Sequence, residues 1–192
     1  MRTGARPLRN LLIVSACLVA FLGAAGCAGK SRRYAQEARS SYISARAVLV
    51  GVQEFPARME KLLRSSQLES MGKQGRELAE DARNLLDAST SAFQACEDKC
   101  RKLQNEGGKK FAPYAEKLLE LVNLNRELMS SYSDLIRLSQ SLMEYQSFLS
   151  NPALLMPELN RLDTVAAAIE EQRDRLHELE SEAERLYLSL TE

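Results

Sequence analysis

The sequence predicts an all-α protein: an elongated antiparallel bundle of about four long heptad-patterned helices, preceded by a cleavable signal peptide. Two observations support this fold class. Apolar residues recur at alternating steps of three and four through four long segments, which is the spacing of one face of a helix. The 192 residues include no Trp, nine Gly and five Pro, and the dominant Ala, Leu, Glu, Arg, Ser and Gln favour helix. No segment alternates as a strand would.

The first 26 residues have the pattern of a secretory signal peptide. Three arginines, with no acidic residue among them, precede an apolar run from Leu11 to Leu22, and small residues follow. A charged start, an apolar core and a small-residue end are typical of such leaders. The stretch from Leu11 to Gly26 holds 16 residues, fewer than the roughly 20 that span a bilayer. A retained membrane anchor is therefore the less favoured alternative.

A cysteine follows this leader directly. Ala24-Ala25-Gly26-Cys27 resembles the lipobox of bacterial lipoproteins, in which small residues precede an invariant cysteine, although that family usually has Leu where this chain has Ala24. The resemblance covers only the leader. It implies that Cys27 receives a diacylglyceryl group, that the leader is cut before it, and that the new amine is acylated. A single acyl chain binds a membrane only marginally, so the several acyl chains that the resemblance implies are consistent with stable anchoring. Ala28 after the cysteine implies the outer membrane in a two-membrane cell.

A second cysteine offers an alternative. Val14-Ser15-Ala16-Cys17 also fits the motif, but it would leave an apolar core of only Leu11 to Ser15, shorter than the usual stretch of about 7–15 residues. We therefore favour Cys27 and divide the chain into a signal peptide (1–26), a lipidated tether (27–33) and a helical-bundle domain (34–192).

The tether is basic. Lys30, Arg32 and Arg33 would lie beside lipid headgroups, where each basic residue adds about 1 kcal/mol of attraction to an anionic surface. An ordinary solvated linker is the alternative interpretation.

The first helix is expected from about Arg32 to Ser70, with Pro56 inside it. Proline removes a helix hydrogen bond and kinks the chain, but the apolar seam keeps its phase across Pro56. We expect a kinked, continuous helix; the alternative is a break near Glu54–Pro56. The expected seam is Tyr34, Ala38, Ser41, Ala45, Val48, Val52, Phe55, Met59 and Leu62.

The second helix is expected from about Arg76 to Asn105. Gly72 and Gly75 mark a turn before it, and Gly107-Gly108 end it as a glycine C-cap. Lys99 is the one exception to its seam, which is Leu78, Ala82, Leu85, Ser89, Ala92, Cys96 and Leu103.

The third helix is expected from about Pro113 to Leu149, and its apolar face is wide enough for two neighbours. Its seam contains Leu118, Leu121, Leu128, Leu135, Leu142 and Leu149, with Asn125, Ser139 and Gln146 at polar positions that fix register.

Ser150-Asn151-Pro152 interrupt the chain, and the fourth helix is expected from Pro157. Its heptad is narrow: Leu162, Val165, Ile169, Gln172, Leu176, Leu179, Ala183, Leu186 and Leu190. A narrow seam also suits the runner-up architecture, an extended coiled-coil hairpin that completes its core as a homo-oligomer.

Cys96 and Cys100 are the pair that remains after the leader is removed. Four residues apart on a helix, their Cβ atoms lie about 5–6 Å apart, whereas a relaxed disulfide needs about 3.5–4.5 Å. Because an exported chain meets an oxidising compartment, we predict a local disulfide. Reduced, packed thiols and a bond to another chain are the alternatives.

Charge is distributed unevenly along the chain. Residues 30–64 carry eight basic and three acidic side chains, and residues 158–192 carry ten acidic and four basic. We expect the first and fourth helices to attract each other across the bundle; the alternative is a basic end facing the membrane and an acidic face offered to a partner. Without the leader, the chain has 23 basic and 26 acidic residues, a balance that disfavours nucleic-acid binding.

The sequence shows no catalytic, metal or cofactor site. His177 is the only histidine, which excludes a bundle di-iron site and a three-histidine zinc site. Its neighbours Glu170 and Asp174 would give at most a weak metal contact and are better explained as a solvated face. The chain also lacks a glycine-rich phosphate loop.

These observations predict a non-catalytic lipoprotein. It would be anchored to the lipid bilayer through acylated Cys27, face the periplasm or cell exterior, and act as a scaffold, adaptor or interaction module for another envelope protein or the cell wall. The alternative is a bundle that holds a small or apolar ligand between its helices, lined by the polar seam residues Asn125, Ser139, Gln146 and Gln172.

Overall fold

The computed structural model describes residues 6–65, 68–144 and 152–191, with side chains from Gly29 onward except those of 63, 65, 68–71, 144 and 152–155. This part of the chain is helical and contains no strand. The helices are α1 (Arg6–Gln53), α2 (Phe55–Ser65), α3 (Leu68–Glu106), α4 (Ala112–Glu144) and α6 (Pro152–Thr191). The predicted all-α class is therefore confirmed.

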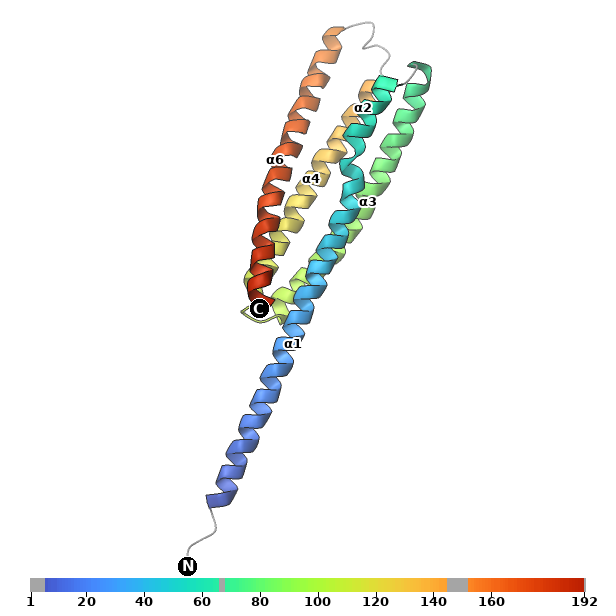
Figure 1. Cartoon of the computed structure of the whole chain (residues 1–192). Coiled ribbons are helices and arrows are strands. Elements are labelled where there is room, and N and C mark those ends of the chain that lie inside the picture. The colour runs from blue at the N-terminus through green and yellow to red at the C-terminus, as the bar shows by residue number, and fades with distance from the viewer. Residues whose placement is uncertain (1–5, 66–67, 145–151, 192) are drawn as a thin grey trace, which may run out of the picture.

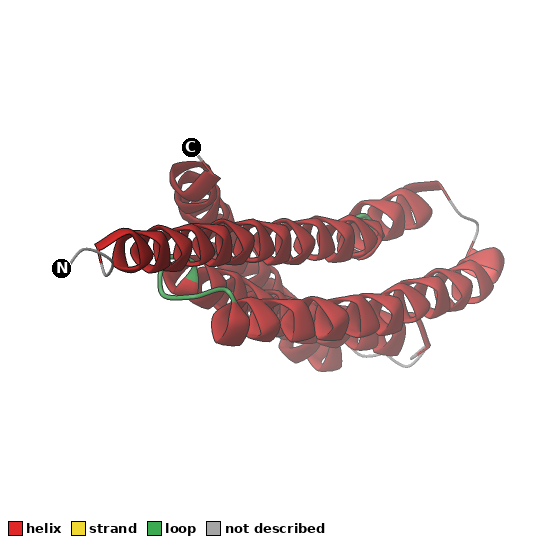
Figure 2. Ribbon diagram, turned by 90° about the horizontal axis from the view of Figure 1, so that it is seen from below, coloured by secondary structure: helices red, strands yellow, loops and turns green. Residues whose placement is uncertain are grey.

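The helices form an antiparallel bundle of four rods, with α2 continuing the rod begun by α1 (Figure 1). Neighbours along the chain are neighbours in space: α1 packs on α3, α3 on α4, and α4 on α6, while α2 packs on α3. α1 makes fewer contacts with α4. The view from below in Figure 2 shows α1 and α3 side by side with the other helices behind them. The last helix ends beside the part of α1 where the bundle begins (Figure 1).

One apolar core runs through the bundle, and the heptad positions supply most of it. Its largest fully buried side chains include aromatic residues from three rods: Phe55, Phe93, Tyr114 and Tyr132. Fully burying a side chain of this kind stabilises a fold by about 1.5–3 kcal/mol. On α3, Cys100 is buried and Lys99 is exposed, so the seam continues from Cys96 through Cys100 to Leu103.

The wide apolar face of α4 meets two neighbours, as predicted, because α4 packs extensively on both α3 and α6. Off-seam residues on it are buried as well, among them Val122, Leu124, Met129 and Ile136. The polar seam positions differ in their surroundings. Asn125 is fully buried, Ser139 is half-buried, and Gln146 lies outside the described residues.

The rod formed by α1 and α2 is broken rather than continuous, which corrects the expected single helix. α1 ends at Gln53, Glu54 is a turn residue and α2 starts at Phe55. Pro56 therefore lies in the first turn of α2, where its missing N–H costs little because first-turn donors have no partner within the helix. α2 ends at Ser65, five residues before the expected end.

The predicted turn at Gly72 and Gly75 is wrong, because both glycines lie inside α3, which starts at Leu68. Gly75 is buried where helices approach closely. A Cβ there would lie 2.2 Å from the Met143 sulfur and 3.7 Å from Leu62. The glycine therefore allows close packing and does not end a helix.

The glycine pair after α3 does end a helix, as predicted. The Gly107 N–H donates to the Leu103 carbonyl at 2.8 Å, and Gly108 has a φ of +76°, a backbone conformation that suits glycine. α4 then starts at Ala112, one residue before the expected Pro113. The expected end of that helix at Leu149 lies outside the described residues.

The last helix starts earlier than predicted. α6 begins at Pro152 and contains Pro157 in its second turn. Proline at the first helical position is favourable, so Pro152, rather than Pro157, starts the helix.

Candidate functional site

The predicted lipidation site lies close to the folded bundle. Cys27 belongs to α1, whose backbone is helical from Arg6 to Gln53, and its side chain is outside the described part. Tyr34 is the first buried side chain among those described. Seven residues of helix correspond to about 10 Å along its axis. An acyl group on Cys27 would therefore hold the bundle directly beside the membrane surface.

The end of the bundle nearest Cys27 is tied together around Tyr34. Its hydroxyl donates to Glu106 Oε2 at 2.9 Å, and Lys30 Nζ lies 3.4 Å from the same oxygen. The Lys102 ammonium lies over the Tyr34 ring, 4.5 Å from its centroid. Hydrogen bonds from Tyr34 and Lys30 lower the pKa of the Glu106 carboxyl. These contacts join the start of the bundle on α1 to the end of α3.

No helix in the described part of the chain is both long enough and apolar enough to cross a membrane.

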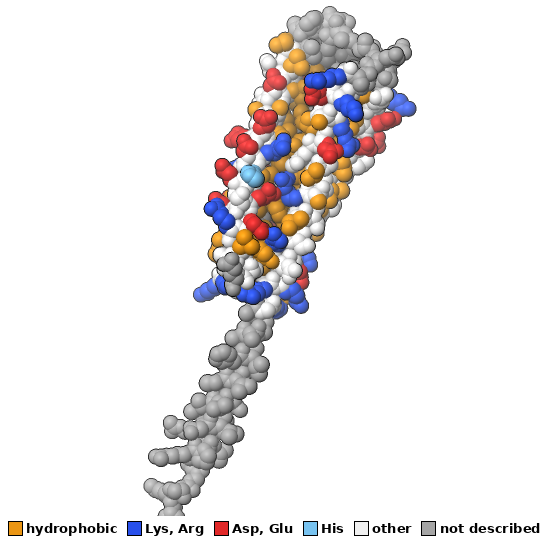
Figure 3. Space-filling view, viewed as in Figure 1, with side chains coloured by type: hydrophobic (Ala, Val, Ile, Leu, Met, Phe, Trp, Pro, Cys, Tyr) orange, Lys and Arg blue, Asp and Glu red, His pale blue; other side chains and the backbone are white. Residues whose placement is uncertain are grey.

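A groove of about 540 Å³ lies between α1 and α6. Its floor is apolar and comes from α4, mainly Tyr114, Leu118 and Leu121. One rim is α1, including the exposed Ile43, and the other is α6, including the exposed Leu188. In Figure 3, apolar side chains follow the crease between these two helices, with charged side chains alongside them.

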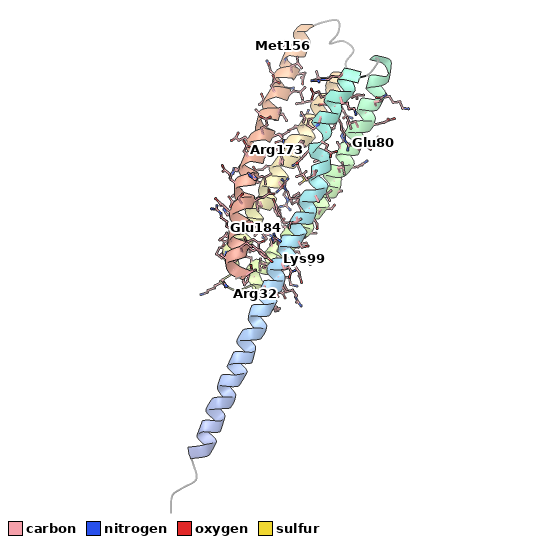
Figure 4. The ribbon with its side chains drawn as sticks, in the orientation of Figure 1. Arg32, Glu80, Lys99, Met156, Arg173 and Glu184 are labelled. Carbon is pink, nitrogen blue, oxygen red and sulfur yellow. The ribbon has the colours of Figure 1, made fainter. Side chains whose placement is uncertain are left out.

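Ion pairs link α1 and α6 across this groove. Arg39 donates to both carboxylate oxygens of Glu184, at 3.0 and 2.8 Å, which is the bidentate geometry that arginine favours. The Arg39 guanidinium also lies 4.8 Å from the Tyr187 ring centroid. Figure 4 shows Glu184 on α6, facing α1. This pairing confirms the attraction that the uneven charge predicted.

A polar network continues from the groove into the core. Tyr42 and Arg46 of α1 both donate to Glu180 Oε1, at 2.6 and 2.8 Å. Asn125 of α4 accepts from Arg46 at 3.3 Å and donates to the Tyr42 hydroxyl at 3.2 Å and to the Leu121 carbonyl at 2.7 Å. Burial, together with the Glu180 carboxylate, raises the pKa of Tyr42. The tyrosine therefore stays neutral and keeps donating.

Two glutamines retain unpaired buried atoms. Gln53 Nε2 and Gln172 Oε1 are buried and have no hydrogen-bond partner among the described residues. Gln53 ends α1 and Gln172 lies on α6, two turns before Glu180. One is a donor and the other an acceptor, and unpaired buried polar groups of this kind cost about 1–3 kcal/mol.

The cysteine pair lies in the core. Cys96 and Cys100 are both fully buried, and their sulfurs are 3.9 Å apart as free thiols. The contact with Cys96 and burial raise the pKa of Cys100, which disfavours a reactive thiolate there. A disulfide would bring the sulfurs to about 2.05 Å, so its formation requires a local shift of α3. The disulfide stays a prediction.

The described residues contain no group of three or more His, Cys, Asp and Glu side chains placed to hold a metal ion. His177 is exposed on the rim of the groove, beside Glu180 and Ser181. Glu170 and Asp174 are exposed on the same helix.

Sequence reasoning missed the residues that shape the groove. Asn125 is predictable as a polar residue in an apolar seam, but its partners Tyr42 and Arg46 lie 83 and 79 positions away in sequence. Both of these residues also donate to Glu180. The available signal was the coincidence of a basic first helix with an acidic last helix. It indicated that the two helices attract each other, but it did not indicate which side chains meet.

No protein-family model matches the chain, and no curated protein or solved structure is significantly similar to it. Its function must therefore be argued from the residues themselves.

Proposed function

We propose that this chain is a membrane-anchored extracytoplasmic lipoprotein whose helical bundle is a non-catalytic scaffold or adaptor for another envelope protein or the cell wall. The observation that carries the proposal is the lipobox-like cysteine Cys27, placed seven residues before Tyr34, the first buried side chain among those the structure describes. An acyl anchor at that position leaves the described apolar core intact, because that core begins after it.

The bundle itself suits a binding role. The buried polar residues of the described core, Ser89, Glu97 and Asn125, are engaged in structural hydrogen bonds. Long helices present extended faces, and the groove between α1 and α6 interrupts one of them. Such a surface offers a partner shape and charge.

The anchoring claim is tested by Cys27→Ser in the full chain, with Cys17→Ser as the matched control. The Cys27→Ser protein should lose the mass of the acyl groups and keep its leader, whereas Cys17→Ser should be processed and anchored like the unaltered protein. An inhibitor of the lipoprotein signal peptidase should reproduce the uncut leader. If Cys27→Ser leaves processing and membrane fractionation unchanged, or if Cys17→Ser abolishes them, Cys27 is not the anchor.

A second candidate function is favoured by the groove. Its floor is apolar, and its volume of about 540 Å³ falls within the usual range of small-molecule sites, roughly 300–1,000 Å³. The ligand would be a small or apolar molecule lying between α1 and α6. Of the residues named from sequence, Asn125, Ser139 and Gln172 do not line the groove, and Gln146 lies outside the described residues. The lining includes Tyr42, Tyr114 and Leu118, and Asn125 is buried behind it.

A fluorescent long-chain fatty acid is a suitable probe for this second function. Saturable fluorescence on the full protein, lost in Ser181→Trp and kept in Ser189→Trp, would support it. Both serines are exposed on α6, but only Ser181 lines the groove. Absence of saturable binding, or equal binding by both variants, would reject a site for such a ligand in the groove.

A further inference from the structure

We propose that the end of the bundle nearest Cys27 is a docking surface for anionic lipid headgroups, so that the protein stands end-on against the membrane that anchors it. We call this end the basal surface. It consists of six exposed cations: Lys30, Arg32, Arg33, Lys102, Lys109 and Lys110. The inference rests on the proposed function, since the acyl anchor is what brings this surface to the membrane.

The charge at this end is one-sided. Residues 29–34, 102–112 and 186–191 together hold these six cations and one acidic residue, Glu106. Glu106 is already engaged, because it accepts from Tyr34 and lies 3.4 Å from Lys30. Lysine and arginine side chains lie at this end in Figure 3, and Figure 4 places Arg32 there.

The opposite end of the bundle is mixed in charge. Residues 54–64, 72–81, 134–143 and 156–163 hold seven basic and eight acidic side chains. Met156, labelled in Figure 4, lies at that end. The excess of positive charge is therefore a property of the basal surface and not of helix ends in general.

The separation from the membrane is short. Lys30, Arg32 and Arg33 follow Cys27 by three to six residues on one helix, which corresponds to about 5–9 Å along the axis. Electrostatic attraction is screened over about 8 Å at physiological ionic strength. Cations held at this distance from an acyl attachment point lie within reach of headgroup phosphates.

The loop between α3 and α4 is held at the same level. Glu106 connects it to Lys30 and Tyr34, and Lys110 Nζ donates to the Leu190 carbonyl at 3.2 Å. A lysine ammonium has three donors, so Lys110 retains capacity for a phosphate. Cations from α1, α3 and the loop therefore lie on one end of the bundle.

An extended anionic surface fits this arrangement better than a small phosphate ligand does. Lys30, Arg33 and Lys102 lie around the Tyr34 ring, 5.4, 5.6 and 4.5 Å from its centroid. With Arg32 and the two lysines of the loop, the six cations extend over the ends of two helices and a loop. Docking on this end would set the bundle upright. The α1 rim of the groove, Arg39 to Arg46, would then lie about 20–30 Å from the lipid attachment.

The test uses the full acylated protein, reconstituted in vesicles of phosphatidylcholine alone or with phosphatidylglycerol. Surface lysines are acetylated with a water-soluble reagent and quantified by mass spectrometry. Lys102, Lys109 and Lys110 should react about five-fold more slowly on the anionic vesicles, as expected for one headgroup contact each. Lys61 and Lys73, exposed at the other end, should react equally on both. Equal reaction of the basal lysines on both vesicles would overturn the inference.

Charge reversal provides the matched comparison. Lys109→Glu with Lys110→Glu should remove the protection of Lys102, whereas Lys61→Glu with Lys73→Glu should keep it; far-ultraviolet circular dichroism checks that both variants fold. If both pairs behave alike, the basal surface is not the docking site. Failure of the proposed function gives a different result, because mass spectrometry would then find no acyl group on the unaltered protein. If the protein is acylated but Lys102, Lys109 and Lys110 are not protected, only the present inference is refuted.

Discussion

Asn125 is a polar residue that the core retains because all its side-chain polar atoms have partners. It is fully buried on α4, where Tyr42 and Arg46 of α1 meet it. Buried amides of this kind fix the register of helices at some cost in stability. Only one alignment of α1 against α4 satisfies these bonds, so Asn125 specifies how the two helices are positioned.

Replacing Asn125 with Ala should lower the free energy of unfolding by about 1–3 kcal/mol, because Tyr42 and Arg46 each lose a buried partner. Asn123→Ala is the matched control: Asn123 lies two residues away on α4 and is exposed, so its change should stay within about 0.5 kcal/mol. Urea unfolding of both variants measures the difference. Equal effects would show that the network does not contribute to stability.

Glu97 makes stability depend on pH. It is largely buried on α3 and accepts hydrogen bonds from Arg126 and from Arg101, the latter at 2.8 Å. The arginines, Arg126 foremost, lower the pKa of its carboxyl from the ordinary 4.5. Since the folded pKa is lower than the unfolded one, the folded state binds this proton less tightly. The resulting stabilisation is present above the unfolded pKa and is lost as pH falls through the folded pKa.

Glu97→Gln should therefore be less stable than the unaltered protein at neutral pH, and the gap should close as pH drops below about 4.5. Asp98→Asn, the exposed neighbour, serves as control and should show a smaller gap at neutral pH. Thermal unfolding across a pH series gives the comparison. A gap for Glu97→Gln that is constant with pH would contradict a charge-based contribution.

At the scale of the helices, the sequence predicted faces better than ends. Heptad spacing identified the buried stripes because burial of apolar side chains follows the 3.6-residue period directly. The predicted ends were wrong where Gly72 and Gly75 suggested a turn and where Pro157 suggested a helix start, whereas Gly107-Gly108 do end α3. At Pro56 the opposite error occurred, because the helix expected to continue is broken there. Gly75 lies inside α3 because α3 needs a residue without a side chain against Met143. That reason is tertiary and is not visible in the local sequence.

The α1–α6 contacts were predictable only in part. Uneven charge predicted that the two helices attract each other, and Arg39 with Glu184 bears this out. The roles of Tyr42 and Asn125 depend on the relative register of segments 83 residues apart. Heptad spacing defines a face on each helix but leaves the alignment between helices undetermined.

α6 is held in the bundle chiefly by its packing on α4, and Leu176 is the most buried leucine of its stripe. Leu176→Ala should lower the free energy of unfolding by about 2–5 kcal/mol, the usual cost of a cavity left by leucine. Leu188→Ala, at an exposed position on the same helix, should change it by less than about 0.5 kcal/mol. Similar losses for the two variants in urea unfolding would mean that α6 is not anchored by this stripe.

At the scale of the whole molecule, the bundle is a ring of four rods in which one contact between neighbours, the α1–α6 contact, is weak. In three contacts, α1–α3, α3–α4 and α4–α6, the helix backbones approach closely. By contrast, α1 meets α6 through long side chains over a groove. The α1–α6 contact is therefore polar and partly open, and its strength depends on the charges of its side chains. A partner or ligand would have access to the molecule here without disrupting the other three contacts.

This asymmetry predicts where the bundle opens first. Arg39→Gln with Arg46→Gln removes the charged partners of Glu184 and Glu180, two half-exposed pairs that together contribute about 1–2 kcal/mol. Amide hydrogen exchange along α6 should accelerate about 5–30-fold, because exchange from a local opening reports its free energy. Amides in the α3–α4 contact should be little affected.

The control for this experiment is Arg58→Gln with Arg64→Gln, which removes two ion pairs of exposed residues on or beside α2, each between residues four positions apart. It matches the change in net charge but leaves the α1–α6 contact intact, so the amides of α6 should exchange as in the unaltered protein. If amide exchange in the Arg39→Gln, Arg46→Gln variant accelerates equally in all helices, α1 and α6 separate only in global unfolding. Selective acceleration along α6 would show that the groove opens within an otherwise folded bundle, which is the motion that admitting a partner requires.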